Sequence, residues 1–295
     1  MKQKKKRKGR KQMWTALVLV LLCSLAISTV SFAANRAMKN KKWVSGQGGT
    51  YLDTDKDGKK DTYQSAGKTY YKLQIPKQGY IVVDVKTSQL PGEKEYNDYL
   101  NEDGEQDVEE DASTTVELLN SQKKPLAQKG NFFSGKNSFV FTATVKKGTY
   151  YLTTEGNQKY KLRYTFTSVP KVNKAGKSLK SAVSWKKGVT VKNLLSADKS
   201  HYYKIKLTKK SKVTLSFNAS VRDTVFDGMN VQILVKKGKN YRTVNNKGKL
   251  IAKNKLFYWE VVGKDKISAT LPKGTYYIRT WTLNGSGGYY TMKWK

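Results

Sequence analysis

The feature that most constrains this 295-residue chain is an internal repeat of its own sequence. The segment FTATVKKGTYYLTTEGNQKYKLRYTFT (141–167) matches ISATLPKGTYYIRTWTLNGSGGYYTMKWK (267–295), and both contain KGTYY. Two further pairs of segments match in the same order, 67–88 with 198–220 and 116–126 with 231–241. Because the order and spacing are kept, we expect two copies of one domain.

Each copy has the residue pattern of β-strands. Apolar and polar residues alternate in YKLQI, YIVVDV, KIKL and VTLSF, as they do in strands that bury one face. Glycine-centred turns separate these runs at intervals of about ten residues. The sequence therefore predicts an all-β protein made of two tandem antiparallel β-sandwiches, which follow an N-terminal signal helix.

The N-terminal segment predicts export. A basic stretch (1–12), an apolar run (13–30) and the small residues of SFAA (31–34) are arranged as in a secretory signal peptide. Residues 1–34 are therefore expected to be removed, and an uncleaved membrane anchor is the alternative. After cleavage we expect no membrane span. The only cysteine, Cys23, lies in this segment, so the exported chain would carry no disulfide.

The strand motifs resemble those of a known family. The order YYKI-x-L, polar turn, VTLSF, VQILV, ISATL-x-KGTYYIRT and YYTMKW is similar to that of the bacterial pre-peptidase C-terminal domain, over nearly all of 66–167 and 198–295. The resemblance implies jelly-roll-like sandwiches that are non-catalytic and appended to secreted enzymes or surface proteins. Some members bind collagen or polysaccharide, and some carry calcium. We expect the two domains at 35–168 and 179–295, joined by a linker at 169–178.

One acidic stretch of the first copy, YLDTDKDGKKDTYQ (51–64), follows the calcium-loop pattern D-x-[DN]-x-[DN]-G. Alternating carboxylates around a glycine turn supply the oxygen ligands that Ca²⁺ requires. The twelfth position holds Gln instead of the Glu of an EF-hand, so the affinity is expected to be modest. The alternative is a solvated turn without an ion. The predicted ligands are Asp53, Asp55, Asp57, Lys59 through its carbonyl, Asp61 and Gln64.

A second acidic run, GEKEYNDYLNEDGEQDVEED (92–111), partly follows the same pattern. Its candidate ligands for a second metal are Asn101, Asp103 and Asp107, and the alternative is a long solvated loop. The second copy has neither acidic stretch, since VKNLLSAD (191–198) stands where the first copy has the calcium-loop pattern. The acidic residues are therefore not required by the fold, which favours a function for them.

The repeated KGTYY predicts a Lys-Gly turn with positive φ, followed by a strand. We expect Tyr150 and Tyr276 to point outward and their neighbours to point inward. Late aromatic residues are candidates for stacking on sugar rings, and the alternative is that they fill the core. These candidates are Trp281, Tyr289 and Trp294, with Tyr290 beside them.

Catalytic patterns are absent from the sequence. His201 is the only histidine and falls within an expected strand, and neither G-x-S-x-G nor H-E-x-x-H occurs. We therefore expect no enzymatic activity, and a cryptic hydrolase is the least favoured alternative.

The two halves of the chain differ in charge. Residues 34–168 hold 21 basic and 17 acidic residues, whereas residues 169–295 hold 28 basic and 5 acidic, a net charge of +23. The basic half has 25 lysines and 3 arginines. Specific nucleic-acid binding favours arginine, so we do not expect it. Lysine-rich surfaces instead attract polyanions of any kind.

These features together predict a secreted, non-catalytic, calcium-binding module. Its basic C-terminal domain would hold it at the surface of a Gram-positive-type bacterium, on an anionic cell-envelope polymer or an acidic polysaccharide. The alternative is an adhesin, or an accessory module of a secreted hydrolase, that recognises an extracellular glycan or protein with its aromatic residues.

Overall fold

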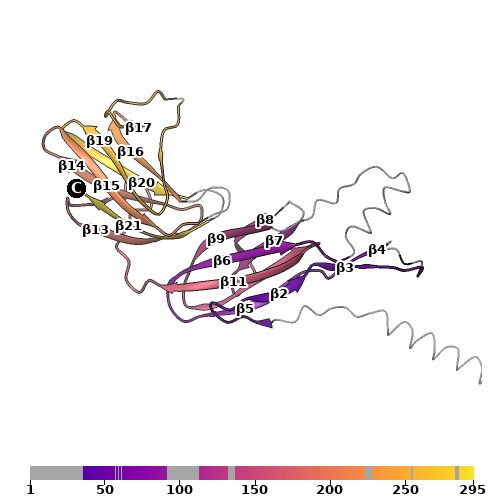
Figure 1. Ribbon diagram of the computed structural model, residues 1–295. Coiled ribbons are helices and arrows are strands. Elements are labelled where there is room, and N and C mark those ends of the chain that lie inside the picture. The colour runs from indigo at the N-terminus through magenta and orange to yellow at the C-terminus, as the bar shows by residue number, and fades with distance from the viewer. Residues whose placement is uncertain are drawn as a thin grey trace, which may run out of the picture. The chain divides into compact units, whose positions relative to one another are not determined.

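The computed structural model of the chain (Figure 1) describes residues 36–56, 58, 60, 62–91, 113–131, 137–222, 228–253, 255–282 and 286–295. Within these residues every regular element is a β-strand, and the strands form two β-sandwiches. The predicted all-β sandwich fold is therefore confirmed. The predicted signal segment lies outside the described residues. None of the described residues belongs to a helix that could cross a membrane.

The first sandwich consists of two sheets that together run from residue 36 to residue 168. One sheet has the order β1 (Arg36–Ala37), β5 (Thr69–Ile75), β10 (Gly148–Gly156), β7 (Thr114–Leu119) and β8 (Pro125–Asn131). The other has the order β2 (Val44–Gln47), β11 (Lys159–Ser168), β6 (Gly79–Ser88) and β9 (Asn137–Val145). Only the β1–β5 pair in these sheets is parallel.

The second sandwich has the same strand order, with one additional strand. One sheet has the order β12 (Val183–Ser184), β14 (Ser200–Leu207), β20 (Gly274–Trp281), β16 (Met229–Lys237) and β17 (Asn240–Thr243), with β18 (Trp259–Val261) also paired to β16. The other has the order β13 (Thr190–Leu195), β21 (Gly288–Trp294), β15 (Ser211–Ala219) and β19 (Lys264–Leu271). The same order in both sandwiches accounts for the repeat in the sequence.

Each sandwich has its own core, built from the inward residues of alternating strands. Tyr71 and Tyr203 occupy equivalent places on β5 and β14, and both are almost completely buried. Each forms a hydrogen bond through its hydroxyl to a second tyrosine hydroxyl, Tyr160 at 3.0 Å and Tyr290 at 2.7 Å. A buried tyrosine needs such a partner, so the two copies solve the same requirement in the same way.

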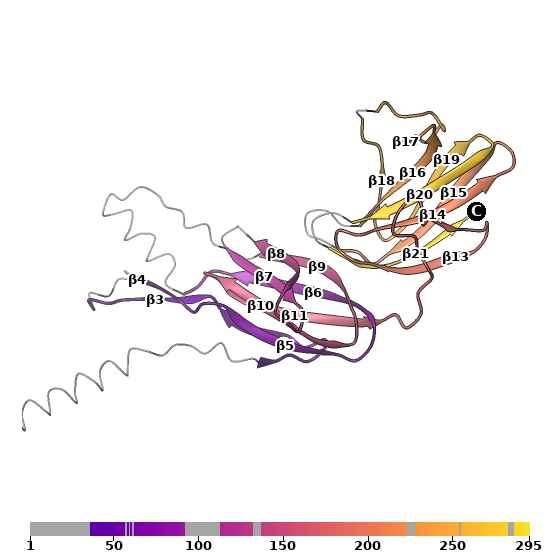
Figure 2. The ribbon, with the colours of Figure 1, turned by 180° about the vertical axis from the view of Figure 1, so that it is seen from behind.

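One difference between the copies within the described residues is a hairpin in the first. Strands β3 (Gly49–Leu52) and β4 (Thr62–Ser65) are inserted between β2 and β5, whereas residues 196–199 connect the equivalent β13 and β14. Both ribbon views show the hairpin projecting from the first sandwich (Figure 1, Figure 2). The hydroxyl of Tyr63 lies 3.2 Å from the carbonyl oxygens of both Gly48 and Gly156 and shares its one proton between them, so it holds the hairpin to the sandwich.

The KGTYY turn agrees with its prediction in one respect and contradicts it in another. Gly148 and Gly274 have φ of 153° and 158°, so the expected positive φ is confirmed. The expectation that Tyr150 and Tyr276 point outward is wrong, because both rings pack against the cores. Leu152 and Ile278, two residues further on, are fully buried, and strand alternation puts residues two apart on the same face. The outward residues are the next tyrosines, Tyr151 and Tyr277.

The segment predicted as a linker is partly attached to both sandwiches. Val169 N–H donates to the carbonyl of Gln78 in the first sandwich at 2.9 Å. Asn173 exchanges hydrogen bonds with Lys192 of β13, and Gly176 forms a bridge with Tyr202 of β14. Residues 173–178 thus belong structurally to the second sandwich.

Candidate functional site: a lysine-lined pocket on the second sandwich

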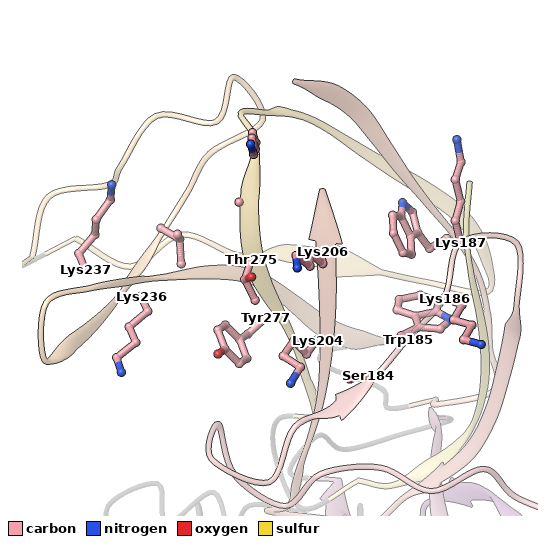
Figure 3. A pocket seen from close by; sticks show the side chains of 14 residues that line it. Ser184, Trp185, Lys186, Lys187, Lys204, Lys206, Lys236, Lys237, Thr275 and Tyr277 are labelled. Atoms are coloured by element: carbon pink, nitrogen blue, oxygen red, sulfur yellow. The ribbon is translucent and has the colours of Figure 1, made fainter. Parts of the chain in front are cut away.

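An open pocket of about 960 Å³ lies on the second sandwich (Figure 3). Seven lysines line it, and no acidic residue does. The lysines come from four separate segments of the chain, which only the folded sandwich brings together. They are Lys186, Lys187, Lys204, Lys206, Lys236, Lys237 and Lys273.

Strand register explains why these lysines converge. Tyr203, Ile205 and Leu207 of β14 are buried in the core, so Lys204 and Lys206 between them must face outward. In the β14–β20 pairing Lys204 lies opposite Tyr277, and Lys206 lies opposite Thr275. The other five lysines come from the end of β16, the turn before β20 and the segment that follows β12.

Aromatic rings and hydroxyls complete the pocket lining. Tyr277 and Thr275 lie on its wall beside the labelled lysines (Figure 3), and Ser184 contributes a hydroxyl. Trp185 and Trp294 lie at its edge but belong to the core, with rings 6.3 Å apart and exposed fractions of 4% and 6%. The indole N–H of Trp185 donates to the carbonyl of Val189 at 2.8 Å.

The positive charge of the pocket is not neutralised within the described part of the chain. The ion pairs found there all lie in the first sandwich, namely Lys68 with Glu117 and Glu155, and Arg163 with Asp84. Six of the seven pocket lysines are exposed and Lys204 is half-buried. Like charges gathered around one hollow produce a positive potential that attracts anions.

The equivalent face of the first sandwich carries only part of this cluster, because Lys39, Lys72 and Lys147 stand where the second copy has Lys186, Lys204 and Lys273. Gln74 lies opposite Thr149 in the β5–β10 pair, as Lys206 lies opposite Thr275 in the β14–β20 pair. Ser121 and Gln122 stand where the second copy has Lys236 and Lys237. The fold therefore does not require lysine at the positions of Lys206, Lys236 and Lys237, and these lysines are specific to the second copy.

The three predicted stacking residues have different environments. Trp294 is buried in the core, so its prediction as a sugar-stacking residue is wrong. Trp294 alternates along β21 with Lys293, which faces outward. This alternation in the sequence indicates that Trp294 points into the core. Tyr289 is half-buried on the outward side of the same strand. Trp281 is half-buried on the outward face of β20, next to Arg279.

The predicted calcium ligands lie on the β3–β4 hairpin of the first sandwich. Both carboxylate oxygens of Asp53 accept backbone N–H groups, from Lys56 at 2.7 Å and from Gly58 at 2.9 Å. Gly58 has a φ of 93°, which suits the glycine position of a calcium loop. Asp55 is exposed in the loop, and Gln64 lies in β4 opposite Thr50.

The other predicted ligands are not among the described residues. Asp57, Lys59 and Asp61 lie outside them, and so do Asn101, Asp103 and Asp107 of the possible second site. The described residues contain no group of three or more acidic, His or Cys side chains that could hold a metal. Of the six ligands proposed for the first site, the structure thus places Asp53, Asp55 and Gln64 on one hairpin.

His201 belongs to a polar network inside the second sandwich. Its Nδ1 lies 2.9 Å from the hydroxyl of Tyr290, which in turn bonds to Tyr203. The amide of Asn193 donates to the Tyr203 hydroxyl at 3.2 Å and extends the network. Burial lowers the pKa of His201 to about 4, because the charged imidazolium loses its hydration there.

Comparison with known proteins finds solved structures of low similarity to this chain. No protein family model and no curated protein matches the chain. Among solved structures, the pre-peptidase C-terminal domain of collagenase from Bacillus anthracis is similar at 16% identity and a TM-score of 0.28, over 42% of this chain and 100% of that one. The tandem CBM51 modules of a family 98 glycoside hydrolase from Streptococcus pneumoniae are similar at 9% identity and a TM-score of 0.22, over 85% of this chain and 98% of that one.

Proposed function

We propose that the chain is an exported, non-catalytic binding module whose second sandwich holds an anionic polymer in the lysine-lined pocket. The observation that carries this proposal is the set of seven lysines around one hollow without an acidic residue among them. The net charge of +23 on residues 169–295 adds long-range attraction to the same half of the chain. In the cell envelope such a module would be retained on an acidic polymer.

The physics of such a site predicts multivalent binding that depends on salt. Each lysine that contacts the polymer releases a condensed counterion, so the logarithm of the affinity falls linearly with the logarithm of salt concentration. The slope of this line is proportional to the number of lysine–polymer contacts. Lysines in the pocket should contribute to the slope, whereas equally exposed lysines elsewhere should contribute little.

The experiment compares two triple variants of the full chain on polyphosphate, a flexible polyanion without sugar rings. Lys204, Lys206 and Lys236 are replaced by Gln in the first, and Lys174, Lys177 and Lys180 in the control. Both variants lose the same charge, but the control lysines, although exposed, do not line the pocket. We expect the pocket variant to lower the salt slope by about 3 and the control to change it by less than about 1. Equal effects of the two variants, or no binding by the wild-type chain, would overturn the proposal.

We further propose that the β3–β4 hairpin binds Ca²⁺. The alternating carboxylates of 53–61 and the wrapping of the loop around Asp53 support this proposal. The binding would be modest, because the bidentate Glu of an EF-hand is missing, and would suit a calcium-rich exterior. Titration calorimetry with CaCl₂ tests it, and the absence of heat at millimolar calcium would overturn it. When the ion is bound, it would stiffen the hairpin by crosslinking its loop.

A further inference from the structure

The lysine-lined pocket continues into a track of aromatic and cationic side chains along β20. Tyr277, Arg279 and Trp281 all point outward, because Tyr276, Ile278 and Thr280 between and before them are buried. Successive outward residues of a strand lie about 7 Å apart, so Tyr277 and Trp281 are separated by about 14 Å. The track is therefore longer than one sugar ring.

Neighbouring strands widen the track with further aromatic rings. Tyr241 of β17 meets Tyr277 edge to face at 5.1 Å between ring centroids. Tyr258, which is 37% exposed, meets Trp281 in the same way at 5.7 Å. These contacts hold the outward rings of β20 in place without burying them, since Tyr277 and Trp281 stay half-exposed.

Arg279 is held between these rings in an orientation that leaves part of its guanidinium group open. The guanidinium lies 4.4 Å from the centroid of the Trp281 ring, and its Nε donates to the Ser200 hydroxyl at 3.2 Å. Among the described residues the terminal nitrogens of Arg279 have no hydrogen-bond partner. A planar guanidinium with two open nitrogens matches the two oxygens of a carboxylate.

The equivalent face of the first sandwich shows that the fold does not require the track. Strand register places Thr153 where the second copy has Arg279, and Glu155 where it has Trp281. There Glu155 lies 3.2 Å from the Lys68 ammonium, so that face carries an internal ion pair. Arg279 and Trp281 of β20 are thus specific to the second copy, whereas Tyr277 has a counterpart in Tyr151.

We propose that the second sandwich binds a polysaccharide whose sugar rings carry carboxylates. Its chain would run along β20 from the lysine-lined pocket to Trp281. Rings of Tyr277 and Trp281 would contact the apolar faces of sugars, and Arg279 and the pocket lysines would pair with carboxylates. A polyphosphate offers charges but no ring faces. This inference rests on the proposed function, because the lysine-lined pocket forms one end of the track.

The test measures binding of the full chain to polygalacturonate and to polyphosphate at equal ionic strength. Trp281→Ala should weaken polygalacturonate binding about fivefold and leave polyphosphate binding within about twofold of wild type. Trp43→Ala is the matched control, because Trp43 is 38% exposed on the first sandwich and also lies under an arginine, Arg163, at 4.5 Å. The control should change neither affinity.

A second variant, Arg279→Lys, keeps the charge and removes the planar pair of donors. It should weaken polygalacturonate binding about threefold while polyphosphate binding stays unchanged. If Trp281→Ala and Arg279→Lys both leave polygalacturonate binding intact, the inference is wrong while binding in the lysine-lined pocket stands. If the wild-type chain binds neither polymer, the proposed function is wrong and the inference with it. The melting temperature of each variant checks that it is folded.

Discussion

At the scale of single residues, buried polar groups distinguish the interiors of the two sandwiches. Both contain a hydrogen-bonded tyrosine pair, but only the second adds Asn193 and His201 to it. The first copy has Thr69 in place of His201. A histidine in such a place stays neutral, and burial lowers its pKa to about 4. The network therefore gives the second sandwich a titrating group that the first one lacks.

This difference predicts how stability depends on pH. The pKa of His201 is about 4 in the folded chain and near 6.5 when unfolded, so the unfolded state takes up the proton first as the pH falls. The contribution of neutral His201 to the free energy of unfolding is complete above pH 6.5. It is lost as the pH falls toward 4, by at most about 3 kcal/mol. Urea unfolding at several pH values measures this loss.

The matched variant is His201→Thr, which introduces the residue of the first copy. It should be less stable than wild type at pH 7, where it loses the contact to Tyr290, and should lack the loss of stability between pH 6.5 and 4. A variant that loses stability over that interval as steeply as the wild-type chain would contradict the assignment to His201.

Residue alternation also shows what the sequence could predict. The positive φ of Gly148 and Gly274 followed directly from the Lys-Gly turn. The orientation of Tyr150 and Tyr276 was predicted wrongly, although the aliphatic residue two positions later marks the inward face. One misplaced starting residue reverses every side chain of a strand, because the period of a strand is two residues. Such a prediction therefore easily assigns a core aromatic residue to the surface, or a surface aromatic residue to the core.

At the scale of elements, the hairpin β3–β4 is an addition to a complete sandwich. The strand register makes Gly48 equivalent to Leu195 of the second copy, and residues 49–67 then replace the four residues 196–199. Tyr63 attaches the hairpin through two carbonyls, and its ring lies 5.1 Å from that of Tyr51. The sheets of the first sandwich are formed without the hairpin. It can therefore change without loss of the fold.

We predict that replacing residues 49–67 by the Ser-Ala-Asp-Lys of 196–199 leaves the first sandwich folded and removes calcium binding. The lost contacts should lower the melting temperature by no more than about 4 °C, which corresponds to roughly 1 kcal/mol for a domain of this size. Calorimetry should show heat with CaCl₂ for the wild-type chain and none for the variant. The point variant Asp53→Ala keeps the hairpin and removes one predicted calcium ligand, so it tests the ligand independently of the hairpin. Calcium heat that persists in the hairpin replacement would place the ion elsewhere.

The order of the strands in the sheet also explains why the lysine-lined pocket could not be predicted from the sequence. The charge of the second half was visible, but Lys187, Lys206, Lys236 and Lys273 are far apart along the chain. They meet because β12, β14, β20 and β16 are adjacent in one sheet, and this order does not follow the order of the sequence. The hairpin loop, in contrast, is local, so its acidic pattern was recognisable as a motif.

At the scale of the whole molecule, the repeat has produced two sandwiches with one strand order and different surfaces. Their cores use equivalent residues, whereas their outward faces differ in charge and in aromatic content. A sandwich determines only which positions face inward, and the outward positions are free to take any polar residue. Binding functions can therefore differ between the copies while the fold stays the same.

Because the copies share a fold but differ in surface charge, we predict that the two halves, produced as separate fragments, differ in their binding to an anionic resin. No sheet joins strands of 36–168 to strands of 169–295 within the described residues, and each half has its own buried core. Fragment 169–295 should bind an anionic resin and elute only at roughly 0.5 M salt or above, where screening is strong. Fragment 36–168, with nearly balanced charge, should elute below about 0.15 M. Circular dichroism confirms that each fragment is folded, and equal elution of two folded fragments would show that the charge asymmetry does not govern retention.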